Sequence, residues 1–559
     1  MAGRPIRAVE ACLSTLVVLC AAVATASAET LTYVLTPEPD SGLLRVDLNW
    51  QTANRTQSRL CVAEHWGTVS DVPALLKDLT FEGASGVQRD KACWQISHRP
   101  GAALRCRYTI DPGRRDFDWT CTHHPITTKT FFHGLGGTFL LTPGPDGGQP
   151  EQYEVLVRWK LPKGWRAICS WGSGPGVGAR LAPEDVRQAV YLAGNLVMHT
   201  TQVPGADELT VALPNKFGFD AAEFADFSAG IIAGECAFMH EAHFPPFVVT
   251  AIPVGEPADS GELHMAGMGL YRSFALCISP RANLNDAVEH LFAHELFHTW
   301  NGRLLRAGAP EESVYWFTEG FTDYYALRIL FESGRWKADV YAKWLNRHLR
   351  EYAANPARNA TNDEIRTGYW KARRTVGEVP YQRGLLLGLR WHKLAREHGI
   401  PEGFDHLLWR LVDRARQGKF ELTNDALRED GRQVLGEWFV PEFDCYVVRA
   451  ETIDVPADAL APELTGHVET VHAYELGFDR ERSLRDKRVR GLVAGSAAGK
   501  AGLREGDELI TWEIPGETDA QVQLQIRRAG QARTIDYYPR GAPSKVLQFK
   551  PQAPDRDGG

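Results

Sequence analysis

The sequence predicts a multidomain protein with an all-β N-terminal domain, an α+β central domain and a smaller C-terminal domain. The chain has 559 residues, which is longer than a domain with a single hydrophobic core usually is. Runs rich in β-branched and aromatic residues dominate residues 29–215, and helical spacing dominates residues 216–455. Short strands return over residues 462–545. Strands and helices do not alternate in the central part, which favours an α+β arrangement over a βαβ series.

The segment 1–28 has the pattern of a secretory signal peptide. Arg4 and Arg7 precede an apolar run at 13–24, and small residues ending at Ala28 follow it. We expect cleavage after Ala28 and an exported protein, periplasmic or secreted. The alternative is an uncleaved membrane anchor, but the apolar run is shorter than a bilayer span. No later run of that length lacks charges, so we expect no stable membrane span after cleavage.

Composition and cysteine content narrow the class further. Hydrophobic residues make up 44% and charged residues 24%, the ordinary balance of a soluble globular protein. The net charge of −8 argues against nucleic acid as a partner, because phosphates require a concentrated basic surface. Of the ten cysteines, Cys12 and Cys20 lie in the predicted signal peptide. The other eight suit disulfides in an oxidising compartment. Several lie at 61–169, so we expect bridges there, with Cys106 and Cys121 as one candidate pair.

Individual strands and helices follow from the spacing of apolar residues. In the N-terminal domain we expect strands at 31–35, 43–48, 130–132 and 153–159. In the central domain we expect a strand at 247–252 and helices at 221–239, 314–331, 336–352, 383–398 and 404–415. The glycine-rich stretch 172–179 contains a proline and starts no helical pattern, so we expect a loop there. We also expect a solvated loop at 480–490 and a frayed tail after Gly541.

The central domain contains one short segment with the chemistry of a metal site, His-Glu-Leu-Phe-His at 294–298. On a helix, His294 and His298 lie four residues apart on one face, so both imidazoles can reach one metal ion. Glu295 lies one position round the helix, where a carboxylate can hold a water. The alternative is a pair of buried structural histidines. His290, one turn earlier, is not followed by glutamate, so we expect it beside the ligands or in ordinary packing.

A hydrolytic zinc site requires a third protein ligand and an open fourth position. The segment 315–325 supplies Glu319 as the candidate third ligand. Asp323, one turn further on, is placed to orient a ligand histidine. We therefore expect one zinc ion per chain, held by His294, His298 and Glu319.

These two motifs resemble those of the gluzincin metallopeptidases. The form H-E-x-F-H-x-W-N at 294–301 is similar, more narrowly, to that of the glycyl aminopeptidase family, whose members carry a PDZ domain after the peptidase domain. Residues 476–478, Leu-Gly-Phe, resemble a PDZ carboxylate-binding loop, and residues 495–510 resemble the most recognisable stretch of that domain. The resemblance implies a thermolysin-like catalytic domain at 216–455 and a PDZ domain at 462–545.

The resemblance also suggests a second catalytic residue beside Glu295. Residues 380–384, Pro-Tyr-Gln-Arg-Gly, resemble the Y-x-K-G segment whose tyrosine stabilises the oxyanion in related aminopeptidases. Tyr381 would then stabilise the oxyanion with the zinc ion, which also acidifies water and polarises the scissile carbonyl. Glu295 would take the water proton and return it to the leaving amine. The alternative for Tyr381 is a core aromatic at a helix start.

The expected function is hydrolysis of peptide bonds by an exported zinc aminopeptidase, with a PDZ domain for substrate capture or regulation. One alternative is a PDZ-assisted endopeptidase in envelope protein quality control. Another is a catalytically inert scaffold that binds peptide C-termini. The expected partners are peptide or protein substrates.

Two finer expectations concern how the substrate is held. The family's G-L-E-H segment, thought to bind the substrate amine, matches 268–273 here, with Tyr271 in place of glutamate. That replacement predicts weaker dependence on a free N-terminus, unless Glu262 substitutes. At the PDZ domain we expect a peptide C-terminus to add as a strand beside the segment following Phe478. The alternative is that this groove packs against the catalytic domain and stabilises it.

Overall fold

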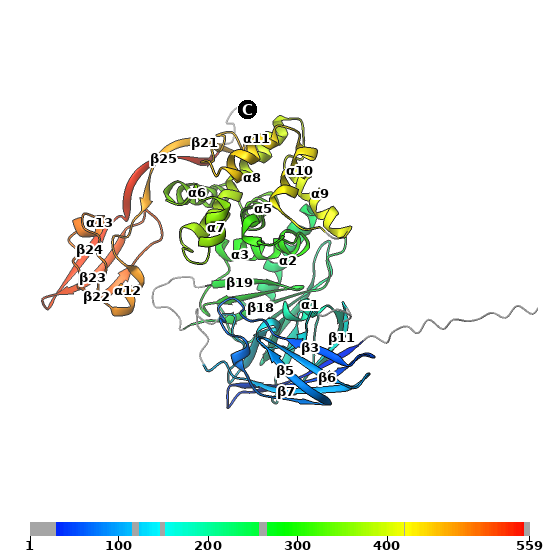
Figure 1. Cartoon of the computed structure of the whole chain (residues 1–559). Coiled ribbons are helices and arrows are strands. Elements are labelled where there is room, and N and C mark those ends of the chain that lie inside the picture. Colours follow the sequence, from blue (N-terminus) through cyan, green and yellow to red (C-terminus); the bar gives the residue numbers. More distant parts are fainter. Residues whose placement is uncertain (1–28, 115–121, 146–150, 256–264, 419, 553–559) are drawn as a thin grey trace, which may run out of the picture.

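The computed structural model describes residues 29–114, 122–145, 151–255, 265–418 and 420–552. The predicted signal peptide, Cys121 and Glu262 therefore lie outside the described residues. The described chain forms an N-terminal β-rich part, a central part rich in helices, and a C-terminal lobe set to one side (Figure 1). Within these ranges, no helix combines the length and the apolar character that crossing a membrane requires.

The N-terminal part is β-rich, as predicted, and its strands form three sheets. Their orders are β14-β11-β1-β2-β7-β4, β10-β3-β6-β5 and β13-β12-β15-β9-β8. The bounds are β1 Thr30–Glu38, β2 Leu43–Gln51, β3 Gln57–Cys61, β4 Leu76–Glu82, β5 Ala84–Asp90, β6 Cys93–His98, β7 Ala103–Ile110, β8 Ile126–Thr127, β9 Phe131–Leu135, β10 Thr142–Pro143, β11 Tyr153–Trp159, β12 Arg166–Cys169, β13 Gly172–Ser173, β14 Gly176–Leu181 and β15 Val190–Gly194, with helix α1 at Pro183–Arg187. Leu31, Tyr33 and Leu35 of β1 are fully buried, because alternate residues of a strand face one side of a sheet.

Two predictions for this part are corrected. The stretch 172–179 is not only a loop, since β14 pairs antiparallel with β11 at the edge of its sheet. The expectation of bridges within 61–169 is confirmed by a disulfide between Cys61 and Cys93, which face each other on β3 and β6. Cys106, suggested as a bridging residue, is a buried free thiol in the described chain.

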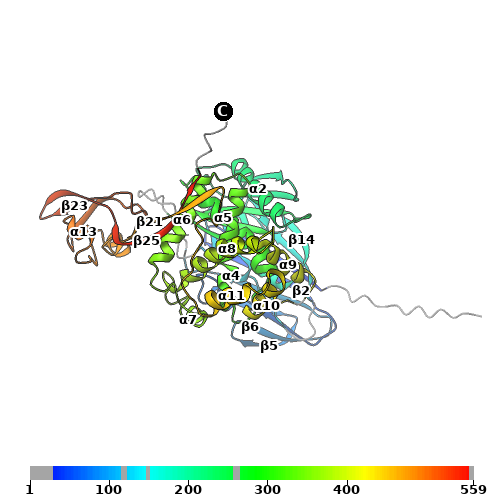
Figure 2. The ribbon, with the colours of Figure 1, turned by 90° about the horizontal axis from the view of Figure 1, so that it is seen from above.

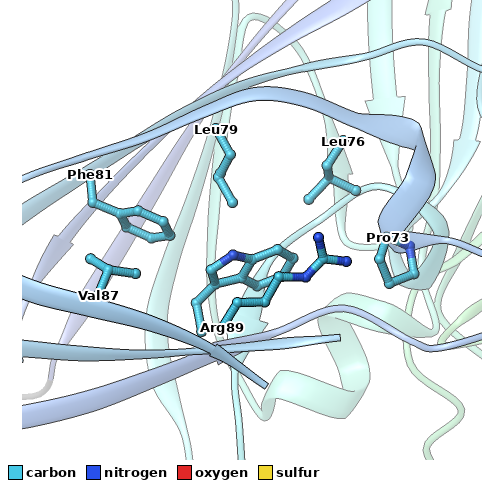
Figure 3. Close-up of a pocket in the computed structure, with 7 residues that line it drawn as sticks. Pro73, Leu76, Leu79, Phe81, Val87 and Arg89 are labelled. Atoms are coloured by element: carbon cyan, nitrogen blue, oxygen red, sulfur yellow. The ribbon is translucent and has the colours of Figure 1, made fainter. Parts of the chain in front are cut away.

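Strands β4 and β5 border an open groove in the N-terminal part, with a volume of about 380 Å³ (Figure 3). Leu79, Phe81 and Val87 line it with apolar atoms. Arg89 and Trp94 also line the groove, and the guanidinium carbon of Arg89 lies 5.4 Å from the ring centre of Trp94. None of these residues belongs to the predicted metal site.

The central sheet crosses the predicted boundary at residue 215. Its order is β16-β17-β18-β20-β19, and its bounds are β16 Val197–Gln202, β17 Glu208–Leu213, β18 Phe247–Pro253, β19 Met265–Leu270 and β20 Ser273–Ile278. Strand β19 lies at an edge and pairs antiparallel with β20. Residues from both sides of that boundary therefore share one sheet.

The central helices cover this sheet and each other (Figure 1). Their bounds are α2 Ala221–Phe238, α3 Asp286–Phe297, α4 Tyr315–Thr318, α5 Gly320–Glu332, α6 Ala338–Ala354, α7 Asn362–Gly368, α8 Val379–Glu397, α9 Asp405–Arg416, α10 Asn424–Leu435 and α11 Phe439–Phe443. The single helix expected at 314–331 is interrupted at Glu319. Helix α8 packs closely against this interruption: a Cβ on Gly384 would lie 1.9 Å from the carbonyl oxygen of Trp316.

The C-terminal lobe is joined to the central part by a two-stranded ribbon of β21 and β25 (Figures 1 and 2). The bounds are β21 Leu464–Tyr474, α12 Arg480–Asp486, α13 Ala497–Lys500, β22 Glu508–Glu513, β23 Val522–Arg528, β24 Gln531–Tyr537 and β25 Arg540–Pro551. Asn346 of α6 binds both backbone groups of Phe549, at 2.8 and 2.6 Å. Phe549 is buried, so the prediction of a frayed tail after Gly541 is wrong for β25.

The expected loop at 480–490 is wrong for its first half, because α12 begins directly after Phe478 and Asp479. The Asp479 side chain caps this helix by accepting from the Arg482 backbone N–H at 3.0 Å. A helix offers no free strand edge. The expectation that a peptide adds as a strand immediately after Phe478 is therefore wrong in its geometry.

Candidate metal centre

Helix α3 carries the predicted histidine motif, and its two ends are well defined. The Asn285 side chain caps its start, accepting from the backbone N–H groups of residues 287 and 288 at 3.1 Å each. Val288, Phe292 and Leu296, spaced four apart, are buried in the core of the central part. This packing leaves positions 290, 294 and 298 together on a neighbouring stripe of the helix.

The chain leaves α3 through a distorted turn that orients His298. The Nδ1 of His298 donates to the carbonyl of Asn301 at 3.0 Å. The buried Asn301 side chain donates to the carbonyl of Phe317 at 2.9 Å and to the hydroxyl of Thr322 at 3.1 Å. Asn301 therefore ties the end of the histidine helix to the segment that carries Glu319. Asn301 is the last residue of the H-E-x-F-H-x-W-N form, but its spacing from the histidines alone predicts no such role.

The three predicted ligands converge on one point. The Nε2 atoms of His294 and His298 lie 3.1 Å apart. The Oε2 of Glu319 lies 3.4 Å from the first and 3.5 Å from the second. A zinc ion with tetrahedral bonds of about 2.0–2.2 Å separates its ligand atoms by roughly 3.3 Å. The spacing fits one such ion.

The protonation of the two histidines supports the same conclusion. The Nδ1 of His298 donates to a carbonyl, and the Nδ1 of His294 faces the carboxylate of Asp323 at 2.8 Å. In the neutral rings each Nε2 is then a lone-pair acceptor. Three acceptor atoms facing one another, with Glu319 as the third, favour a positive charge between them, which either a metal ion or a proton can supply.

Asp323 lies behind His294, and its Oδ1 also faces His290 Nε2 at 3.0 Å. His290 thus lies beside the ligand set, one of the two positions expected for it. His290, His294 and Asp323 could themselves surround a metal ion. However, the carboxylate accepts from both rings, so this group forms a hydrogen-bonded chain that fixes His294. Such partners orient metal ligands in many sites.

The electrostatics of the centre favour positive charge. Burial lowers the pKa of His294, but Asp323 and Glu319 outweigh burial and hold it well above its ordinary value. Conversely, the pKa values of both carboxylic acids lie below their ordinary values despite burial, because the histidines stabilise the ionised forms. A metal ion at this point would supply the positive charge that the two carboxylates favour.

Glu295 lies against the edge strand β19. Its Oε2 accepts from the backbone N–H of Gly269 at 2.7 Å, and the carbonyl of Gly269 accepts from Arg303 at 3.0 Å. A Cβ at position 269 would lie 2.5 Å from the carbonyl oxygen of Glu295, so only glycine allows this approach. Neither Gly269 nor Arg303 was singled out as functional from the sequence. A glycine inside a strand pattern is the signal for such a close approach.

Tyr381 lies on α8, close to the ligands. Its ring centre is 6.1 Å from that of His294, with the planes inclined at 27°. Burial, and then the charge of Glu319, raise the pKa of Tyr381 well above its ordinary value. The phenol therefore stays protonated at neutral pH and can donate a hydrogen bond.

Tyr271 packs against the N-terminal part of the chain. Its backbone N–H donates to the carbonyl of Gln188 at 2.6 Å, and its ring packs against the core of the N-terminal part. Gly269, two residues earlier, is the β19 residue that contacts Glu295. The β19 position directly beside Glu295 therefore has no side chain, and the placement of Tyr271 at an amine-binding position stays a prediction.

Comparison with known proteins finds a family model that matches the site and solved structures with a similar fold. The family model of M61 glycyl aminopeptidases matches residues 287–376, which include all three converging ligands. No curated protein matches the chain. The fold is similar to that of an aminopeptidase N family protein from Idiomarina loihiensis, with TM-score 0.70, 16% identity, and coverage of 94% of this chain and 98% of that chain. An M1 zinc metallopeptidase from Deinococcus radiodurans matches at TM-score 0.49 and 15% identity, over 77% of this chain and 95% of that one.

The matched segment and the ligand geometry together define the class of this protein. It is a zinc metallopeptidase, with a fold that the aminopeptidase N family protein shares.

Proposed function

We propose that this protein is an exported zinc peptidase of aminopeptidase type, with His294, His298 and Glu319 as the ligands of one zinc ion. The observation that carries the proposal is the convergence of these three groups beside Glu295. Export is supported by the Cys61–Cys93 disulfide, because such bonds persist in oxidising compartments.

The side chains around the ligands divide the chemistry between them. When bound, zinc polarises the scissile carbonyl and makes a nearby water more acidic. Glu295 takes the proton of the attacking water and passes it to the leaving amine. The N–H of Gly269 holds one carboxylate oxygen of Glu295, which leaves the other oxygen for the water. Tyr381 donates to the oxyanion that develops on the carbonyl.

The surroundings of Arg303 bear on whether a free substrate amine is required. Burial lowers the pKa of Arg303 to about 10, although the negative charges of Asp185 and Glu184 act to raise it. Both acids already have partners: Glu184 binds Arg187, and Asp185 accepts from the backbone N–H of Ala182. Both carboxylates are therefore already engaged by other groups of the chain, although a carboxylate can accept from more than one donor.

The N-terminal part contributes an imidazole rather than an acid near Glu295. Burial and His124 lower the pKa of His123, and the charge of Glu295 opposes that shift. With no side chain at Gly269, the described residues beside Glu295 do not repeat the carboxylate of the family's amine anchor. This observation favours a second candidate function, an endopeptidase.

We expect hydrolysis of a free peptide and of its N-acetylated twin to differ by less than about tenfold in kcat/KM. A charged hydrogen bond to the amine would contribute about 1.5–3 kcal/mol, or roughly tenfold to hundredfold. The measurement is the ratio of initial rates on a matched pair of peptides. A preference for the free amine above a hundredfold would contradict the expectation and show that an anchor lies elsewhere.

We further propose that residues 462–545 form a PDZ domain that captures substrates or regulates the peptidase. The resemblance of 476–478 and 495–510 to PDZ motifs supports this. Leu476 and Phe478 contribute to an apolar core that the lobe does not share with the central part.

A deletion that spares the ribbon can test the lobe. Cutting the chain at 462 would remove Leu464, Val546 and Phe549 from the central core. Replacing residues 475–539 with a short turn keeps β21 and β25, which still pair up to Tyr474 and Arg540. We expect unchanged hydrolysis of short peptides, an unchanged unfolding midpoint, and slower cleavage of long substrates. Equal loss on short and long substrates, with a lower midpoint, would instead support a purely structural lobe.

A further inference from the structure

An arginine from the segment between α7 and α8 lies against the hydroxyl of Tyr381. The Nη2 of Arg373 is 3.3 Å from Tyr381 Oη, and Tyr369 Oη is 3.2 Å from the same oxygen. The guanidinium carbon of Arg373 lies 4.6 Å from the ring centre of Tyr369 and 5.3 Å from that of Tyr381. Both the charge and the donors of Arg373 are thus directed at the two phenols.

The position of Arg373 is fixed by the backbone rather than by an acid. Its Nη1 donates to the carbonyl of Gly377 at 2.8 Å. No carboxylate in the described part of the chain pairs with it within 4.0 Å, although Glu378 acts on its charge from further away. A guanidinium stacked on two rings, with one group donating to a carbonyl, keeps its remaining donors in a defined direction.

The chemistry of these groups sets the direction of the hydrogen bond between Arg373 and Tyr381. A guanidinium can only donate, so Tyr381 Oη must accept from Arg373. A phenol has one proton, and accepting on the oxygen leaves that proton free for another acceptor. Either phenol can donate in the pair of Tyr369 and Tyr381, and when Tyr369 donates it is a second donor to the same oxygen. The proton of Tyr381 is then available for the substrate oxygen.

We propose that Arg373 is a positioning residue for Tyr381. Its donor occupies a lone pair of the phenol oxygen, aims the phenol proton at the oxyanion of the substrate, and makes the phenol a stronger donor through its charge. This inference rests on the proposed function, in which Tyr381 donates to the oxyanion.

Arg373→Met is expected to lower kcat about tenfold to hundredfold and to change KM less than about threefold, because a donor that strengthens in the transition state acts on kcat. Arg373→Lys should recover part of the loss, because an ammonium can also donate. Arg374→Met is the matched control, because the Arg374 side chain is 85% exposed and pairs with Glu481 of the C-terminal lobe. We expect wild-type kinetics for it. Zinc content and the unfolding midpoint are measured for every variant.

A double-mutant cycle with Tyr381→Phe separates this inference from the proposed function. We expect Arg373→Met to cause no further loss once Tyr381→Phe is present. If Tyr381→Phe alone leaves kcat unchanged, the proposed role of Tyr381 fails, and this inference fails with it. If Tyr381→Phe is slow but Arg373→Met still exerts its full effect, only the inference is overturned. A rise in KM at constant kcat would also overturn it, because Arg373 would then bind substrate directly.

Discussion

Replacing Glu295 with glutamine is expected to lower kcat at least ~100-fold while zinc stays bound and the fold stays intact. Glutamine cannot take a proton from water at neutral pH. Its carbonyl oxygen can still accept from the N–H of Gly269, as the glutamate Oε2 does at 2.7 Å. The substitution therefore removes the base and keeps its position. Steady-state hydrolysis of a peptide, together with zinc content per chain, measures both effects.

The informative control is the metal. A Glu295→Gln protein that contains one zinc per chain and turns over near the wild-type rate would show that Glu295 is not the base. If the same variant lost its zinc, the lower rate would not report on proton transfer. A wild-type protein without stoichiometric zinc would favour the inert peptide-binding scaffold.

Glu319→Gln is expected to weaken zinc binding by more than about 100-fold and to abolish hydrolysis at ordinary zinc concentrations. The ligand set of the variant consists of two imidazoles and a neutral amide. None of these groups carries a negative charge to balance the charge of the ion. Competition with a chromogenic chelator gives the affinity. The unfolding midpoint without metal shows whether the protein remains folded.

Asp323→Asn provides a graded comparison for Glu319→Gln. Asparagine can still accept from His294 Nδ1, now 2.8 Å from the carboxylate, but it lacks the negative charge. Outer partners of metal ligands typically contribute 10–100-fold in affinity, so this variant should fall between wild type and Glu319→Gln. Equal zinc affinity for Glu319→Gln and the wild type would contradict the ligand assignment.

Spacing within one element could be predicted from the sequence. His294 and His298 face one point because residues four apart share a side of a helix. The strands with alternating burial, such as β1, follow from the period of two in the same way. Glu319 and Asp323 were also predictable as a pair, since one helical turn separates them.

Contacts between elements were not predictable, and several of them complete the site. Gly269 reaches Glu295 across 26 residues of chain. Arg373 contacts Tyr381 from a segment outside α8. The sequence motif around Tyr381 does not show where the donors of Arg373 point. Gly384 of α8 approaches the backbone of Trp316 closely, beside the interruption at Glu319.

The boundaries of the domains also depend on contacts between segments that are distant in sequence. β16 and β17 complete a sheet whose other strands lie beyond residue 215, and β25 is ordered by Asn346 and the buried Phe549. The sequence by itself determined which residues can act together on one helix or strand, because local backbone geometry sets those faces. Only the tertiary structure decided which faces meet, because burial of apolar surface and pairing of backbone groups depend on chain segments that are distant in sequence.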